Sequence, residues 1–223
     1  MPEDNPVRAG ARILITGFEP FGGEPVNPSW QVAQALDGAA IAGARVVAVQ
    51  LPCVFGQALS ALDMALQRVR PDLVLCLGQA GGRCDFSLER VAINVDDARI
   101  DDNAGARPID EPVVPGGPAG LFATLPIKAM VAALRAQGLP ASVSQSAGTF
   151  VCNHVFYGLM HRLQAQPGMR GGFMHLPLLP EQAARAPGQP SLPLVVLVEG
   201  VRVALAAARR TGADLKLPGG AIS

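Results

Sequence analysis

The sequence predicts an α/β fold in which helices cover the faces of a buried sheet. Short β-branched runs alternate with helical patterns along most of the chain, which is the pattern of strands connected by helices. With 223 residues, 49% of them hydrophobic, the chain is long enough for one sizeable core and too apolar for a disordered protein. No internal repeat, linker or low-complexity tract divides it, so we expect a single domain over residues 1–223.

The first half of the chain contains three nearly continuous apolar runs, which predict buried strands at 11–16, 44–50 and 72–77. We expect a helix in each of the two intervals between them. Asn27 followed by Pro28 fits an N-cap and a first helical position. The second helix is predicted by one apolar stripe at spacings of four and three: Phe55, Leu59, Leu62, Leu66 and Val69.

The second half continues the alternation after a long polar loop. Further strands are predicted at 86–95, 141–144 and 172–176. Helices are predicted from Thr124 and Pro126 to Gly138, over 150–164, and over 194–210. The stretch from 96 to 120 is rich in Asp, Pro and Gly, and so long a loop in a compact domain is usually functional or mobile.

Charge and composition exclude several classes of partner. Eighteen basic and eighteen acidic residues give zero net charge, so we expect neither nucleic acid nor an anionic membrane surface as a partner. Glu199 and Arg202 interrupt the longest apolar stretch, and residues 1–10 lack the apolar core of a signal peptide. We therefore expect a soluble, cytoplasmic protein. The four cysteines lack C-x-x-C spacing, and we expect free thiols.

Cys152 is the candidate nucleophile. It follows residues 146–151 (SAGTFV), which we interpret as a strand-to-helix turn that would place Cys152 in the first turn of its helix. Free backbone amides and the positive end of the helix dipole favour a thiolate there, so we expect a pKa below the ordinary value of about 8.5. The small residues at 146–149 would also let a substrate carbonyl approach backbone amides, as an oxyanion hole requires.

Three histidines, at 154, 161 and 175, are the candidates for a general base. His154 lies two residues after Cys152, which is about 200° around a helix, so the two side chains should diverge. His175 ends a short strand, and the carboxyl ends of strands are where α/β folds build their sites. We therefore predict His175 as the base. Glu89, among apolar neighbours on a predicted strand, is the candidate for orienting its imidazole.

Several segments in chain order support this assignment by resemblance. They are 17–23 (GFEPFGG), 78–83 (GQAGGR), 89–94 (ERVAIN), 97–100 (DARI), 146–157 (SAGTFVCNHVFY), 173–177 (FMHLP) and 179–182 (LPEQ). Together they resemble pyroglutamyl peptidase type I, the pyrrolidone-carboxylate cysteine peptidases. The resemblance implies Cys152 as nucleophile, His175 as base and Glu89 as the residue that orients it, in an enzyme that removes N-terminal pyroglutamate through a thioester.

The same resemblance carries further expectations. It implies a three-layer α/β/α sandwich around a twisted, partly mixed sheet, a homotetramer, peptide substrates that begin with pyroglutamate, and no metal or other cofactor. The substrate head is a neutral, flat lactam, which is held by apolar contacts and hydrogen bonds rather than by charge. Residues matching those of the family that contact the substrate are Phe18, Phe21, Gln79, Phe150 and, near the oxyanion, Arg99.

Other interpretations remain open. His154 and His161 would share a helix face, so with Cys152 a metal site is conceivable, although packing or a subunit contact is the more common role. A nucleoside phosphorylase-like enzyme would also suit a sandwich fold, and it would depend on phosphate and tolerate thiol alkylation. An oligomeric protein that binds lactam-like ligands would show saturable binding without hydrolysis.

Overall fold

A seven-stranded mixed sheet forms the centre of the protein, of which the computed structural model describes residues 10–220. Its strands are β1 (Arg12–Phe18), β2 (Ala40–Ile41), β3 (Ala44–Leu51), β4 (Leu73–Gln79), β5 (Phe86–Glu89), β8 (Ala141–Ser144) and β9 (Arg170–Leu176). The order across the sheet is β2-β3-β1-β4-β9-β5-β8. Strands β1, β3, β4 and β9 are parallel, whereas β5 is antiparallel to β9.

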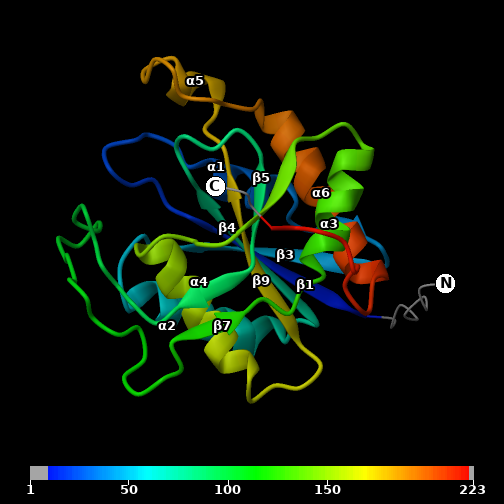
Figure 1. The fold of residues 1–223 in the computed structure, drawn as a ribbon, viewed down its shortest axis with the longest axis horizontal. Coiled ribbons are helices and arrows are strands. Elements are labelled where there is room, and N and C mark those ends of the chain that lie inside the picture. The colour runs from blue at the N-terminus through cyan, green and yellow to red at the C-terminus, as the bar shows by residue number, and fades with distance from the viewer. Residues whose placement is uncertain (1–9, 221–223) are drawn as a thin grey trace.

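Helices cover both faces of this sheet (Figure 1). The helices are α1 (Pro28–Ala35), α2 (Gln57–Val69), α3 (Ile127–Ala136), α4 (Val151–Leu163), α5 (Pro180–Ala183) and α6 (Leu194–Arg210). One hydrophobic cluster joins α1, α3 and α6 to one face, and a second joins α2 and α4 to the other. The predicted fold, a three-layer α/β/α sandwich around a partly mixed sheet, is confirmed.

The sheet has a switch point between β1 and β4. The two strands pair from Ile13–Leu73 to Thr16–Cys76, and beyond these residues β1 continues beside β3 while β4 continues beside β9. From β1 the chain passes to β2 and β3 on one side of the sheet, whereas β4, β9, β5 and β8 lie on the other side. Ligand sites of open α/β sheets form at such a switch point, outside the carboxyl ends of the strands.

Local sequence signals account for the first helix. The Asn27 side chain accepts a hydrogen bond from the Ser29 amide, and Pro28 occupies the first helical turn, as predicted.

The second helix differs from the prediction at its start, because Phe55 lies outside α2. Gly56 has φ +71°, a left-handed conformation that helical residues do not adopt, so the helix begins only after it.

The predicted strand over 86–95 is two strands in two sheets. Its first part is β5, in the main sheet, whereas its second part, β6 (Val91–Ile93), pairs with β7 (Gly120–Phe122) in a small separate sheet. The break falls at Arg90, whose amide donates to the Ser144 carbonyl and whose carbonyl accepts from the Ala123 amide. Two charged residues, Glu89 and Arg90, interrupt the apolar positions at this point, but they do not indicate that the two halves pair in different sheets.

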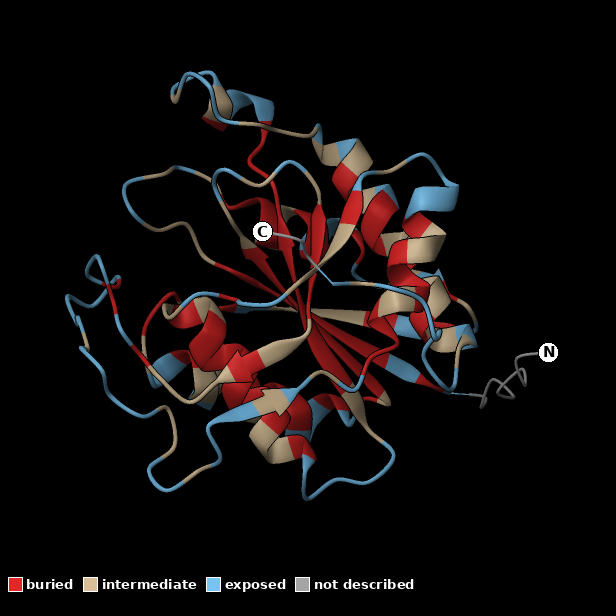
Figure 2. Ribbon diagram, viewed as in Figure 1, coloured by how far each residue is buried: buried red, intermediate tan, exposed pale blue. Residues whose placement is uncertain are grey.

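The interior and the long loop differ sharply in exposure (Figure 2). Central strand residues are almost entirely buried, while most residues from 99 to 119 are exposed or half-buried. The loop is nevertheless held in place, because Asp102 accepts a hydrogen bond from the Phe55 amide and Asn103 donates one to Glu19.

Within residues 10–220, the helices are too short or too polar to cross a membrane. The four cysteines are free, as expected.

Candidate active site

Cys152 lies in the first turn of α4, at the second residue of the helix. Among residues 10–220 no side chain caps this helix end, so the first backbone amides are left for another acceptor. The next residue, Asn153, is fully buried and anchors the turn, because its amide group bonds to the backbone of Ile93 and Val95. The position of the half-buried Cys152 is therefore fixed by contacts with β6 and the segment that follows it.

The sulfur of Cys152 lies directly over the end of β4. A Cβ atom added to Gly78 would be 2.8 Å from Sγ of Cys152, closer than real contacts allow, so glycine makes the room that the sulfur occupies. Gly78 is the ladder partner of His175 on the neighbouring parallel strand β9. Paired residues of adjacent strands face the same side of a sheet. The structure thus brings Cys152 and His175 to the same face, one strand apart.

His175 is held by Glu89. Nδ1 of the histidine lies 2.8 Å from Oε1 of Glu89, and both side chains are buried, with exposed fractions of 4% and 0%. A carboxylate oxygen only accepts, so Nδ1 carries the proton and Nε2 is the basic nitrogen. Among the residues that the structure describes, no hydrogen bond occupies Nε2 of His175. The ring also packs against Phe173, with 4.9 Å between centroids.

Arg83 is a second partner of Glu89 that the sequence analysis did not assign. Its Nη1 donates to Oε1 of Glu89 at 2.8 Å, and its Nη2 donates to the carbonyl oxygen of Ser146 at 2.9 Å. The signal for such a partner was present, because a carboxylate buried among apolar residues requires a compensating charge. Spacing alone did not identify which of the nearby arginines supplies it.

His154 forms a separate pair on the far side of α4 from the sulfur. Its Nδ1 lies 2.7 Å from Oδ2 of Asp96, and its Nε2 accepts a hydrogen bond from the Gly56 amide at 2.9 Å. Both ring nitrogens are therefore occupied. This geometry agrees with the predicted divergence of His154 from Cys152. Within residues 10–220, no three His, Cys, Asp or Glu side chains come together as metal ligands.

The expected thiolate at Cys152 is wrong for the resting protein. Burial raises the pKa of the Cys152 thiol, nearby Cys53 and Glu89 raise it further, and Arg83 opposes them. Burial lowers the pKa of His175, against the attraction of Glu89. The helix rule considers only the local amides, whereas desolvation comes from packing that the sequence does not reveal. Both shifts favour the neutral form, the thiol of Cys152 and the uncharged imidazole of His175.

An aromatic cluster lies at the start of α4, where Phe150 is the N-cap residue. The rings of Phe21 and Phe150 are 6.0 Å apart, and the ring of Phe55 meets Phe150 edge to face at 5.4 Å. Phe55 was not among the predicted site residues, because it was interpreted as part of a helical stripe. Phe18 differs from the other predicted aromatic residues, since it is 2% exposed and packs against Phe173 at 6.5 Å.

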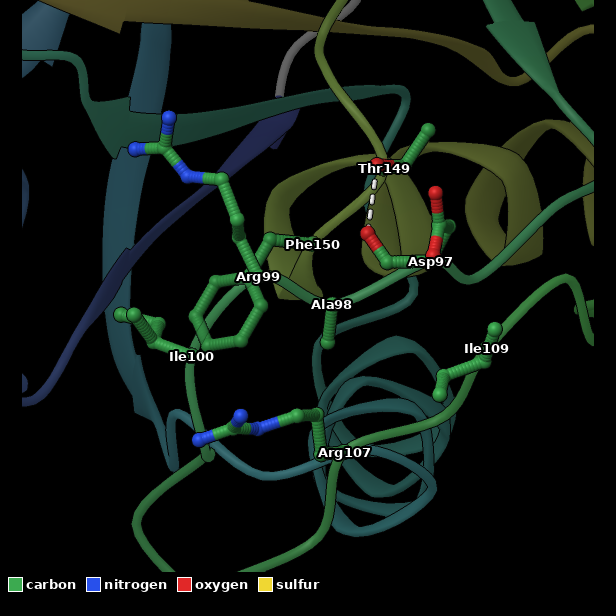
Figure 3. A pocket seen from close by; sticks show the side chains of 8 residues that line it. All are labelled: Asp97, Ala98, Arg99, Ile100, Arg107, Ile109, Thr149 and Phe150. Atoms are coloured by element: carbon green, nitrogen blue, oxygen red, sulfur yellow. Dashed lines mark hydrogen bonds between the residues drawn. The ribbon is translucent and has the colours of Figure 1, made fainter.

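The other two predicted contact residues lie at the edges of this region. Gln79, the last residue of β4, accepts a hydrogen bond through Oε1 from the buried Gln182 amide at 3.0 Å. Arg99 is exposed and lines a cavity of about 600 Å³ together with Thr149, Phe150 and residues of the 97–109 segment. In the view of Figure 3, the Phe150 ring lies between Arg99 and Arg107. This cavity therefore adjoins the aromatic cluster.

Comparison with known proteins identifies many relatives. A family profile described as pyroglutamyl peptidase matches residues 11–211. A pyrrolidone-carboxylate peptidase of Klebsiella pneumoniae is 62% identical over 211 residues, which is 95% of this chain and 99% of the relative. Another from Cupriavidus taiwanensis is 64% identical over 210 residues, covering 93% of this chain and 97% of the relative.

Solved structures agree with the sequence matches. The crystal structure of pyroglutamyl peptidase I from Bacillus amyloliquefaciens has a TM-score of 0.92 and 45% identity, covering 94% of this chain and all of that chain. A mutant pyrrolidone carboxyl peptidase from Pyrococcus furiosus has a TM-score of 0.86 and 42% identity, with 88% and 97% covered. The resemblance inferred from the sequence motifs is confirmed, and the chain belongs to the pyroglutamyl peptidase family of cysteine-type hydrolases.

Proposed function

We propose that this protein is an exopeptidase that removes an N-terminal pyroglutamyl residue from peptides. Cys152 is the nucleophile, His175 the general base and Glu89 the residue that orients the imidazole. The observation that carries the proposal is the hydrogen bond from His175 Nδ1 to Glu89, on the strand next to Gly78. Gly78 is the residue that makes room for the sulfur of Cys152. The names of the 57–64% identical relatives support the same substrate.

The proposed reaction begins with neutral groups. Nε2 of His175 takes the thiol proton as the sulfur of Cys152 attacks the pyroglutamyl carbonyl carbon, and the carbonyl oxygen gains the electron pair. The resulting intermediate collapses as the C–N bond breaks, and His175 transfers its proton to the departing amine. Water then attacks the thioester, His175 removes a proton from it, and pyroglutamate leaves as the thiol re-forms. The opposite pKa shifts of the two groups favour proton transfer during attack over a preformed ion pair.

The uncapped start of α4 is the proposed oxyanion hole. The backbone amides beside Cys152 have no capping side chain in the part of the chain that the structure describes, and Gly148, with φ +76°, turns the chain just before the helix. Amides held in this way stabilise negative charge that develops on a carbonyl oxygen. Arg99 is proposed to contribute from the rim of the neighbouring cavity, where it is exposed and has no hydrogen-bond partner among the described residues.

The lactam ring is proposed to bind against the aromatic cluster. Phe21 and Phe150 are half-buried, Phe18 is buried against Phe173, and the backbone of Gln79 is available at the open edge of β4. A neutral ring needs apolar contact and a few hydrogen bonds, and this set supplies both kinds. The cavity beyond Phe150 is where the rest of the peptide would extend.

The test is hydrolysis of a chromogenic pyroglutamyl amide under reducing conditions. Wild-type protein should release the chromophore, while Cys152→Ala should not, with an unchanged circular dichroism spectrum. Cys84→Ser is the matched control, because Cys84 is an exposed free thiol, and it should keep full activity. Iodoacetamide should inactivate both the wild type and Cys84→Ser. No release by the wild type would contradict the proposal, as would turnover that required phosphate or binding without hydrolysis.

Two expectations from the resemblance stay predictions. The homotetramer is checked by multi-angle light scattering of the purified protein, where a mass four times 23.1 kDa is expected. A cytoplasmic location is checked by cell fractionation of the source organism.

A further inference from the structure

Arg83 takes no part in the reaction described above, although it contacts two parts of the site. It lies in the connection between β4 and β5, with 28% of its side chain exposed, while the Glu89 side chain that it contacts is 0% exposed. One guanidinium nitrogen donates to Oε1 of Glu89 and the other donates to the Ser146 carbonyl. A single planar group therefore joins the buried carboxylate to the segment that leads into Cys152.

The carboxylate of Glu89 needs this second donor. Its Oε1 accepts from both His175 and Arg83, whereas its buried Oε2 has no hydrogen-bond partner among the described residues. A carboxylate held by the imidazole alone could rotate about its broad terminal torsion and turn the ring with it. Arginine presents its donors in a rigid fork, so it fixes the direction of an acceptor as well as balancing its charge.

We propose that Arg83 is a positioning residue of this site, which fixes Glu89 against His175 and ties the segment before Cys152 to the same carboxylate. The kinetic part of this inference rests on the proposed peptidase function. The geometric part does not, because the contacts of Arg83 exist whatever the substrate is.

Arg83 also acts on His175 through its charge. The ionisable groups around His175 are Glu89 on β5, Arg83 in the β4–β5 connection and Cys152 on α4. Burial lowers the pKa of His175, Glu89 raises it, and the positive charge of Arg83 lowers it. Removing that charge should therefore raise the pKa of His175, so that the ring loses its basic form at a higher pH.

Arg162 is a matched control within the same chain. Its guanidinium also joins a carboxylate, Asp63, to a backbone carbonyl, that of Gly158, and its side chain is 24% exposed. It lies near the end of α4, ten residues after Cys152 and so about 15 Å along the helix. Loss of either arginine removes the same kind of bridge, but only Arg83 contacts the candidate site.

The experiment compares Arg83→Gln, Arg83→Lys and Arg162→Gln with wild type, using pyroglutamyl amide kinetics across pH and thermal melting. Arg83→Gln should lower kcat about 10- to 100-fold, the usual loss when a supporting partner is removed, with KM changed less than about 3-fold. The acid limb of its kcat/KM profile should move to higher pH. Arg83→Lys should restore the position of that limb and part of kcat. Arg162→Gln should change only the melting temperature.

Histidine ring NMR provides a readout that needs no turnover. The three histidines can be assigned by substitution, and the pKa of His175 should be higher in Arg83→Gln than in wild type or Arg83→Lys. Wild-type kcat in Arg83→Gln would overturn the proposal. So would an unmoved His175 titration, or equal loss in Arg83→Gln and Arg83→Lys. If wild-type protein does not cleave the amide, the peptidase proposal fails by itself, and the NMR titration still decides the role of Arg83.

Discussion

Two buried histidine–carboxylate pairs lie near the start of α4. They differ in whether the second ring nitrogen of the histidine has a hydrogen-bond partner. His175 and His154 each present Nδ1 to a carboxylate, at 2.8 Å and 2.7 Å, and in each case the second carboxylate oxygen has no partner among the described residues. The Nε2 atom of His154 accepts the Gly56 amide, whereas no described hydrogen bond occupies Nε2 of His175. Contact with a carboxylate therefore does not mark a base. What distinguishes a base is a second nitrogen left free to accept a proton.

The two carboxylates also differ in their other partners. Glu89 has Arg83 as an ionic partner, while the backbone of Asp96 forms a bridge to Glu111 and its side chain serves His154. The His154 ring in turn packs edge to face on Phe55, which contacts Phe150. We therefore expect the His175–Glu89 pair to move a proton, whereas the His154–Asp96 pair supports the aromatic cluster.

Replacing the two histidines should give the largest contrast. We expect His175→Gln to lower kcat/KM about 10⁴-fold or more, because no other group near the sulfur takes up its proton. His154→Gln should lower kcat/KM less than about tenfold and mainly reduce the melting temperature. Steady-state kinetics and thermal melting of both variants check this. A comparable loss of kcat/KM in the two would show that the free nitrogen does not decide the role.

Replacing the two carboxylates should give the same contrast in kcat, with a smaller difference than for the histidines. Glu89→Gln is expected to lower kcat about 10³- to 10⁴-fold with little change in KM, because an amide no longer fixes the Nδ1–H tautomer. Asp96→Asn keeps an acceptor for His154 and should lower kcat less than about tenfold. The measurement is the separate determination of kcat and KM. A rise in KM as the main effect of Glu89→Gln would contradict an orienting role.

Removing one ring from the aromatic cluster should affect substrate binding alone. Phe55→Leu removes the ring that lies between His154 and Phe150, and we expect KM to rise about 3- to 10-fold, as for the loss of one aromatic pair. The value of kcat should stay within about 2-fold of wild type. Initial rates over a range of pyroglutamyl amide concentrations separate the two constants, and a fall in kcat with constant KM would refute this role.

The smallest effect is expected in the pH dependence. Burial lowers the pKa of His175 below 6.5, so its basic form persists into mild acid and the acid limb of kcat/KM should lie below pH 6.5. The unfolded chain takes up this proton near pH 6.5 while the folded protein does not, so the free energy of unfolding should fall as pH drops below 6.5. Urea titrations of wild type and His175→Gln at two pH values test this, and an acid limb above pH 6.5 would contradict it.

Sequence patterns predicted the sheet better than the details at its edges. The strands near 11–16, 44–50 and 72–77 were predictable because buried parallel strands are continuously apolar. The break at Arg90 was not, since residues on both sides of it are typical of a strand and do not indicate which strand each half meets. Phe55 matched the helical spacing of α2, but the positive φ of Gly56 makes that helix begin only after Phe55.

The site was predictable where a residue's role follows from its own neighbours in the sequence. Cys152 early in a helix and His175 at a strand end were both inferred from local order, and both lie in those places. The partner of Glu89 and the ionisation of Cys152 depend on contacts between distant segments. Arg83 joins Glu89 to the carbonyl of the distant Ser146, and burial raises the pKa of the Cys152 thiol, so neither could be inferred from spacing.

The most direct test of this account is a crystal structure of the protein treated with a pyroglutamyl aldehyde. We predict a covalent bond from Cys152 to the aldehyde carbon, with Nε2 of His175 within about 3.2 Å of the new hydroxyl oxygen or the sulfur. His154 should keep its bonds to Asp96 and Gly56. A bond to another cysteine, or a His175 ring that remains beyond reach of the adduct, would contradict it.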